Sequence, residues 1–248
     1  MHRITISPTQ IHDRQIALTT EQHHYFTRVI RLQAGGQFQA IDGTGQLYLA
    51  EILADASLRT ATGTAKIIQI SLALSPELSP ITLICALPKG NSFDDIVRAC
   101  TELGVTTILP AISDRTLLNP SPQKLQRWRK IAQEATEQSE RILSPTIAEP
   151  QSLQAIFSQL TAPSHKYLCE ARGEHPHLLT SLQATQLQDI PIEIAIGPEG
   201  GWTDSELELA IEHDFQLVSL GRNVLRTITA PIVALSIVTA ALENQEEG

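Results

Sequence analysis

The 248-residue chain has few cysteines and no long hydrophobic run, and each absence excludes a class of protein. Its three cysteines, Cys85, Cys100 and Cys169, lie far apart without CxxC spacing, which favours reduced buried thiols over disulfides or a zinc site. No stretch approaches the roughly 18 apolar residues that a membrane-spanning helix needs. The N-terminal segment "MHRITISPTQIHDRQ" lacks the continuous apolar core of a signal peptide. We therefore expect a cytoplasmic protein with no metal and no membrane partner.

Positive charge is also scarce, but it is unevenly distributed. The chain has 18 Lys and Arg against 27 Asp and Glu, a net charge of -9. Residues 1–130 contain 13 basic and 10 acidic residues, whereas residues 131–248 contain 5 and 17. Because a nucleic-acid backbone needs only a local positive stripe, the candidates for binding RNA are Arg28, Arg31, Lys124 and Arg127. The alternative is that these residues form ordinary solvated helix faces.

Residues 1–75 have the pattern of a small β domain. The segment "GGQFQAIDGTGQLYLAEIL" alternates apolar and polar residues about the turn "DGTG", which predicts a hairpin, and "TAKIIQISLAL" supplies another strand. Before them, "TTEQHHYFTRVIRL" predicts a helix with Thr20 as its cap. A small β-barrel with one helix fits this stretch, and the proline-punctuated "SPELSP" (75–80) predicts the linker to the next domain.

Residues 76–248 alternate between strand and helix patterns. Expected strands are "ITLICAL", "VTTILPAI", "KYLCEA", "IEIAI" and "FQLVSL". Expected helices are "SFDDIVRACTELG", closed by Gly104, "SPQKLQRWRKIAQEATEQSER", "DSELELAIEHD" and "ITAPIVALSIVTAALEN". This alternation predicts an α/β domain with a mostly parallel sheet.

The segment "IGPEGGWTDSE" (196–206) predicts a ligand-binding loop. The strand "IEIAI" ends at Ile196, and the capping-box pair Thr203 and Glu206 starts a helix near Asp204. In open α/β sheets this junction is where ligands bind, and glycines allow close backbone approach. Asp204 and Glu206 disfavour a phosphate, so a nucleoside-like ligand with a positive centre fits better. The alternative is an ordinary turn.

A second loop of the same character follows "FQLVSL". Gly221 leads into Arg222 and Arg226, and the helix expected at 227–242 carries no charge. A charge-free helix in a soluble protein is expected to be buried on every side, inside the fold, against a second subunit, or both. Arg226 would then stand at the edge of a buried region.

These two loops resemble the cofactor motifs of SPOUT-class RNA methyltransferases. The resemblance is closest to the bacterial RsmE-type family, which methylates N3 of a uridine in small-subunit ribosomal RNA. Besides "IGPEGGWTDSE" and "LGRNVLRTITA", the matching motifs are "LPKGNSFDDIVRACTELGVTTILP", "RWRKIAQEATEQSERILSP", "HHYFTRVIRLQAGG" and "IDGTG". They occur in the family's order and extend over nearly the whole chain.

The resemblance implies a PUA-like barrel, a C-terminal trefoil knot, bound S-adenosylmethionine and a homodimer with its site at the subunit interface. The partner would be 16S ribosomal RNA or the small ribosomal subunit. The implied cofactor residues are Leu168, Cys169, Glu170, Ile196, Gly197, Pro198, Glu199, Gly200, Gly201, Leu220, Gly221, Val224, Leu225 and Arg226. Glu199 has two possible roles: its negative charge could complement the positive sulfonium of the cofactor, or it could fix its own loop by accepting backbone N–H bonds.

The implied catalytic residues are Arg226, which would stabilise the uracil anion, and Arg141 of "EQSER". One departure concerns the last motif, which in the family usually reads Leu-Arg-Thr-Glu-Thr. Here Ile228 replaces the glutamate. Two rival functions are a SPOUT enzyme for a transfer-RNA ribose or base, and a non-catalytic RNA-binding protein with a degenerate knot.

Overall fold

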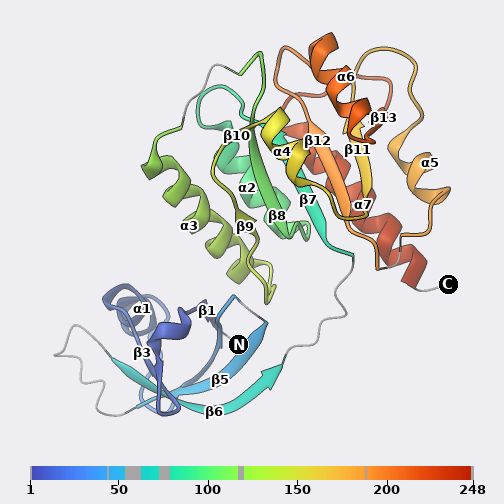
Figure 1. The fold of residues 1–248 in the computed structure, drawn as a ribbon. Coiled ribbons are helices and arrows are strands. Elements are labelled where there is room, and N and C mark those ends of the chain that lie inside the picture. Colours follow the sequence, from blue (N-terminus) through green and yellow to red (C-terminus); the bar gives the residue numbers. More distant parts are fainter. Residues whose placement is uncertain are drawn as a thin grey trace. The chain divides into compact units, whose positions relative to one another are not determined.

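The computed structural model describes residues 2–43, 45–53, 63–72, 79–116, 120–187 and 189–246. The chain forms two compact units (Figure 1). The first comprises Met1–Ser75 with Thr136–Ser144, and the second comprises Pro76–Ala135 with Pro145–Gly248. Residues 75–78 of the expected linker lie outside the described residues. The first unit thus includes residues 136–144, which the expected division at 75/76 left in the second.

A six-stranded sheet forms most of the first unit. Its strands, in spatial order, are β1 (Arg3–Thr5), β4 (Gln37–Ile41), β5 (Gln46–Ile52), β6 (Thr64–Leu72), β3 (Gln15–Ala17) and β2 (Ile11–His12). The expected hairpin is β4 and β5, which pair antiparallel in register from Gln37↔Glu51 to Ile41↔Leu47. The alternating pattern places Phe38 and Ala40 in the core of this unit. Thr44 of the turn lies outside the described residues.

The helical segment of the first unit begins one residue earlier than expected. Helix α1 (Thr20–His24) is capped by Thr19, and the expectation of Thr20 was wrong. Thr19 Oγ1 accepts the Gln22 backbone N–H at 3.2 Å, and Gln22 Oε1 accepts the Thr19 N–H at 2.9 Å. This reciprocal capping box requires a glutamine three residues after the cap, which only Thr19 has. The chain continues as a π-helix, η2 (Tyr25–Val29), and a short 3-10 helix, η1 (Pro8–Gln10), precedes β2.

The second unit has the expected parallel sheet, in which every recorded strand pair is parallel. Its spatial order is β10 (Gln151–Ser152), β8 (Thr107–Ile112), β7 (Ile81–Ala86), β12 (Ile192–Ile196), β11 (His165–Cys169) and β13 (Gln216–Val218), with β9 (Thr146–Ile147) also paired to β8. The short strands β9 and β10 carry too little periodicity to be predicted. Because β12, β11 and β13 are parallel neighbours, their carboxyl ends meet at one edge of the sheet.

Helices cover both faces of this sheet (Figure 1). One core contains side chains of α2 (Ser92–Glu102), α3 (Pro122–Gln138), α5 (Leu178–Gln183) and α7 (Thr229–Glu246). The opposite core contains side chains of α4 (Leu153–Gln159) and α6 (Asp204–Glu212). Two boundaries are confirmed: Gly104 follows the end of α2 with a φ of +93°, and the Thr203–Glu206 capping box starts α6.

The charge-poor helix α7 is buried on one face within the chain. Ala234, Leu235 and Val238 are fully buried, whereas Val233 is half-buried and Ser236 is exposed. The expectation of burial on every side is therefore not met within one chain, and a second subunit stays a prediction. No helix in the described parts of the chain is long and apolar enough to cross a membrane.

Glu193 is a carboxylate inside the second unit, on the middle of β12, and is only 6% exposed. Burial raises the pKa of its carboxyl group, against the opposing influences of a hydrogen bond with Ser164 and the charge of Lys166. Its Oε2 has no hydrogen-bond partner among the described residues. The folded chain therefore holds this proton more tightly than the unfolded chain, and stability falls as pH rises above the group's ordinary pKa.

We expect Glu193→Gln to raise the free energy of unfolding at pH 7 by about 1 kcal/mol, because it removes a buried charge with an unpaired oxygen. The melting temperature should rise by about 2–4 °C. Near pH 4, where the carboxyl group is largely protonated in both states, the gain should shrink. Calorimetry at the two pH values measures this, with Glu212→Gln on the exposed side of α6 as the control. A lower melting temperature at pH 7 would contradict the expectation.

Candidate active site

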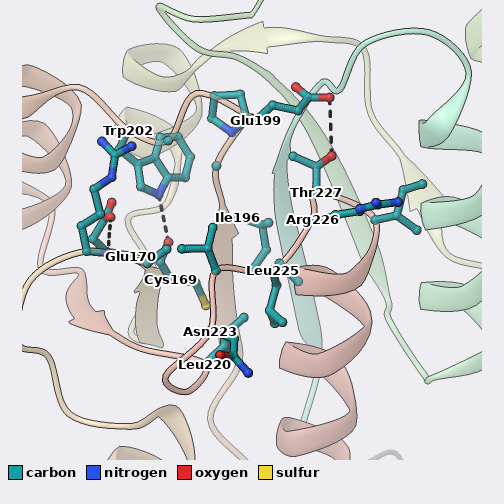
Figure 2. A pocket seen from close by; sticks show the side chains of 18 of the residues that line it. Cys169, Glu170, Ile196, Glu199, Trp202, Leu220, Asn223, Leu225, Arg226 and Thr227 are labelled. Carbon is teal, nitrogen blue, oxygen red and sulfur yellow. Dashed lines mark hydrogen bonds between the residues drawn. The ribbon is translucent and has the colours of Figure 1, made fainter.

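A pocket of about 590 Å³ lies where strands β11, β12 and β13 end. Residues 169–172 begin at the last residue of β11, residues 196–202 begin at the last residue of β12, and residues 220–230 lead from β13 into α7. Figure 2 shows side chains from all three segments around one space. Ser92 at the start of α2 adds to the lining. The junctions that the sequence singled out therefore form one site.

The structure brings together twelve of the fourteen predicted cofactor residues. Those that line the pocket are Cys169, Glu170, Ile196, Gly197, Pro198, Glu199, Gly201, Leu220, Gly221, Val224, Leu225 and Arg226. Leu168 and Gly200 do not line it. Leu168 is fully buried in the core on the other face of the sheet, because alternate strand residues point to opposite faces. A Cβ atom at Gly200 would point at Arg115.

A buried carboxylate and a protonated thiol stand side by side at the end of β11. Glu170 is 8% exposed, and its Oε1 accepts the Arg172 backbone N–H at 2.7 Å. Burial raises the pKa of the Cys169 thiol to about 12, so it is not a nucleophile at neutral pH. Cys85 and Cys100 are also free and buried as expected, whereas Cys169 is only half-buried at the pocket wall.

Glu199 ties three loops of the site together. Its Oε1 accepts the Lys89 backbone N–H at 3.0 Å and the Thr227 hydroxyl at 3.5 Å. Lys89 follows β7, Glu199 follows β12, and Thr227 precedes α7. Figure 2 shows Glu199 and Thr227 facing each other. These contacts favour the loop-fixing role for Glu199, which is also among the residues that line the pocket.

Trp202 forms the other end of the same loop. It is 6% exposed, and its Nε1 donates to the Cys169 carbonyl oxygen at 3.1 Å (Figure 2). A Cβ atom at Gly197 would lie 3.0 Å from the indole ring, so a larger residue there would press against the ring. Trp128 is also buried, at 1% exposed. Both tryptophans therefore pack inside the second unit, and Trp202 also lines the pocket.

The two predicted catalytic arginines occupy different surroundings. Arg226 is exposed and lines the pocket, and its carbonyl oxygen accepts the N–H groups of Thr229 and Ala230 at the start of α7. Arg141 lies in the first unit and does not line the pocket. Burial lowers the pKa of its guanidinium.

The four predicted RNA-binding residues also differ. Arg28 and Arg31 are exposed in the first unit. In the second unit, Lys124 Nζ donates to the Gly90 carbonyl oxygen at 3.2 Å. Arg127 Nε lies 2.7 Å from Asp94 Oδ2 in an ion pair. Lys124 and Arg127 therefore connect α3 to the start of α2, and contacts of these two residues with RNA stay a prediction.

Sequence reasoning missed several lining residues. Ser92, Asn223 and Thr227 lie within the quoted motifs but carried no separate signal, whereas Arg172 lies just beyond the segment expected near Leu168 to Ala171. Arg115, which contacts the loop of residues 197–202, had no sequence signal at all, because it lies in an ordinary polar turn after β8.

The composition of the pocket suits a nucleoside with a positive centre. Ile196, Leu220 and Leu225 offer apolar surface for a base, while Glu170 and Glu199 offer negative charge. The Glu206 carboxylate at the start of α6 accepts backbone N–H groups of Thr203 and Asp114. The Thr203 hydroxyl in turn accepts the Glu206 N–H, so the capping box uses N–H groups at the helix start that a phosphate would otherwise need.

The chain is similar to known RNA methyltransferases. Residues 75–239 match the model of an RNA methyltransferase domain, and residues 18–58 match an RNA methyltransferase PUA domain. The chain is 43% identical to ribosomal RNA small subunit methyltransferase E of Synechocystis, over 98% of this chain and 78% of that protein. It is 27% identical to the protein of the same name from Bacillus subtilis, over 92% of this chain and 90% of that protein.

A solved structure extends the likeness to three dimensions. Ribosomal RNA small subunit methyltransferase E from Neisseria gonorrhoeae, bound to S-adenosyl methionine, superposes with a TM-score of 0.81 at 27% identity. The match covers 97% of each chain. Both units of this chain thus have counterparts in a relative that holds the cofactor.

Proposed function

This chain belongs to the RNA methyltransferase family that includes ribosomal RNA small subunit methyltransferase E, and we propose that it methylates N3 of a uridine in 16S ribosomal RNA. The methyl donor is S-adenosylmethionine, which the Neisseria gonorrhoeae relative binds. The main support for the proposal is that twelve predicted cofactor residues line one pocket at the ends of three parallel strands.

The residues of the pocket fit this donor. Apolar side chains of Ile196, Leu220 and Leu225 would contact the adenine, and Gly197 and Gly221 let the backbone come close. Glu170, buried and accepting one backbone N–H, has carboxylate oxygen to offer a ligand hydroxyl or ammonium group. The Glu199 carboxylate adds negative charge at the same wall.

The sulfonium of the bound donor supplies an activated methyl group. The chain must align the acceptor base and stabilise the negative charge that develops on it. Uridine N3 loses its proton and attacks the methyl carbon in line, while the carbon–sulfur bond breaks and its electron pair stays on sulfur. Arg226, exposed at the pocket, would stabilise the anionic uracil through a carbonyl oxygen. The base must leave its helix to enter the site, as in other base-modifying enzymes.

The proposed function also implies an oligomeric state and a cellular location for the protein. A homodimer would cover the outward face of α7, which holds the half-buried Val233 and the exposed Ser236. Arg141 would contribute from the first unit, in the same chain or the partner, to RNA or to the flipped base. The trefoil knot stays a prediction of the family resemblance. We expect the protein to act in the cytoplasm, where small ribosomal subunits are assembled.

Two other functions would use the same fold. A related enzyme could methylate a transfer RNA, and a non-catalytic RNA-binding protein could keep the fold without the chemistry; Ile228 is the residue that favours the latter. Calorimetry with S-adenosylmethionine separates binding from no binding. Mass spectrometry of ribosomal and transfer RNA from cells with and without the gene identifies the substrate. Loss of one N3-methyluridine from 16S RNA alone supports the proposal, whereas an unchanged 16S RNA contradicts it.

RNA binding is expected to weaken steeply with salt despite the acidic composition. Each phosphate contact should contribute about -0.7 to -0.9 to the log–log slope of affinity against salt. The double variant Arg28→Ala with Arg31→Ala should make that slope less steep, because fewer phosphates are contacted. Cofactor affinity should stay unchanged, because both side chains are exposed in the first unit. Filter binding across salt concentrations measures the slope, with Arg98→Ala on α2 as the control. An unchanged slope in the double variant shows that RNA docks elsewhere.

A further inference from the structure

Arg115 stands behind the loop of residues 197–202, on the side away from the pocket. Its Nη1 donates to the carbonyl oxygen of Gly200, with longer contacts to those of Gly201 at 3.5 Å and Trp202 at 3.3 Å. Of the loop residues 197–202, Gly200 is the one that does not line the pocket. One side of the loop therefore faces the pocket, and the other side is held by a single guanidinium group.

The close approach at Gly200 is a second observation of the same arrangement. A Cβ atom at this position would lie 2.9 Å from Arg115 Cδ. Gly200 does not adopt the left-handed conformation, which Gly201 does with a φ of +73°. The backbone at Gly200 thus tolerates alanine, but an alanine methyl group there would displace the flexible Arg115 side chain.

The turn that carries Arg115 is itself fixed. The Thr116 N–H donates to the Ser113 carbonyl oxygen at 2.9 Å, which closes the turn after β8. The Asp114 N–H donates to Glu206 Oε1 at 2.9 Å, and the Thr203 hydroxyl donates to Asp114 Oδ2 at 3.0 Å. The turn is therefore attached to the start of α6, immediately after the loop that Arg115 holds.

We propose that Arg115 is a positioning residue that keeps loop 197–202 in the conformation that binds the methyl donor. The inference rests on the proposed function, since it assumes that this loop binds S-adenosylmethionine. Hydrogen bonds from a charged donor are stronger than neutral ones, so a single side chain can bias the loop. Without Arg115 the binding-competent conformation is a smaller fraction of the population, and the apparent dissociation constant rises in inverse proportion to that fraction.

The test compares Arg115→Ala and Arg115→Lys with the wild type in calorimetry with S-adenosylmethionine. Arg115→Ala should raise the dissociation constant about tenfold, as for one lost charge-assisted hydrogen-bonding group, and lysine should restore part of it. The Michaelis constant for the donor should rise in parallel, while kcat at saturating donor stays within about twofold. Arg98→Ala, another exposed arginine that pairs with Asp95 on α2, is the matched control.

Gly200→Ala supplies an independent arm. In the wild-type background the new methyl group should displace Arg115 and weaken donor binding. In the Arg115→Ala background the same substitution should have little further effect, because the side chain it meets is gone. This non-additivity is a readout that a general loss of stability would not give.

The outcomes separate the inference from the function. No heat with the wild-type protein would overturn the proposed function itself. Wild-type binding with an unchanged dissociation constant in Arg115→Ala would overturn the inference and leave the function standing. A lowered kcat at saturating donor with an unchanged Michaelis constant would also overturn it. If Arg115→Ala does not fold, Arg115→Lys and Gly200→Ala decide: weaker donor binding in both supports the inference, and unchanged binding overturns it.

Discussion

An Arg226→Ala variant is expected to lose about 10² or more in the rate of methyl transfer, as for one removed charge-stabilising donor. Arg226 is exposed at the pocket and stands in the loop that Glu199 and Thr227 hold. Donor binding should change much less than rate, because the guanidinium is proposed to act on the uracil anion. Single-turnover kinetics at saturating donor, together with calorimetry, separates the two. An equal loss of donor affinity and rate would place Arg226 on the cofactor instead.

The pH dependence follows from the absence of a carboxylate at position 228. Ile228 lines the pocket and packs against the main core of the second unit, so it neither accepts a proton nor orients Arg226. Deprotonation of N3 must then come from solvent or another group. The rate should rise with pH towards the ionisation of uridine itself, and a plateau near neutral pH would reveal a protein base.

Ile228→Glu is the contrasting variant for this prediction. Restoring the residue usual in the family should change the rate modestly at most if the arginine alone suffices. A gain of several hundredfold would show that the carboxylate matters and that this chain is a weakened enzyme. No methyl transfer at any pH, with the donor still bound, would favour the non-catalytic RNA-binding function.

The pocket could be predicted because its signals are local. Glycine and proline after an apolar strand, followed by a capping box, define a loop at a strand end whatever surrounds it. Parallel topology then brings the segments after β11, β12 and β13 together at one edge. The same reasoning gave the start of α6 at Asp204 and the end of α2 before Gly104.

The contacts that could not be predicted join residues far apart in the chain. Gly200 was placed in the pocket because glycine indicates close approach, but the approaching group is Arg115, 85 residues away in the chain. Lys124 and Arg127 were predicted as RNA contacts, with ordinary solvated helix faces as the alternative, and Gly90 and Asp94 give them partners within the chain. Nothing in a local pattern indicates which distant group will meet a charge or a glycine.

Helix α7 shows the same limit in a longer element. The charge-free stretch 227–242 predicts burial, but it does not indicate which residues face the chain's own core and which face a partner. The structure assigns Val238, fully buried, to the core. Val233, half-buried, lies on the face that includes the exposed Ser236 and Ala240. Two lysine substitutions on one helix can therefore distinguish folding from assembly.

Val238→Lys is expected to destabilise the fold by about 3–5 kcal/mol, because it places an unpaired charge in an apolar core. The melting temperature should fall by roughly 10 °C or more, or the protein should aggregate. Asn244→Lys, at an exposed position near the end of the same helix, should leave it unchanged. A native melting temperature in Val238→Lys would contradict the placement of α7 in the core.

Val233→Lys should give the opposite combination. Its side chain can extend from a half-buried position towards solvent within one chain, so the monomer should keep its fold. In a homodimer that covers this face the same lysine would be buried without a partner, and dimers should dissociate at micromolar concentration. Light scattering and thermal unfolding together measure both properties. A stable dimer in Val233→Lys would mean that the subunits meet through another surface, whereas a folded monomer that no longer transfers methyl groups would show that the site needs its partner.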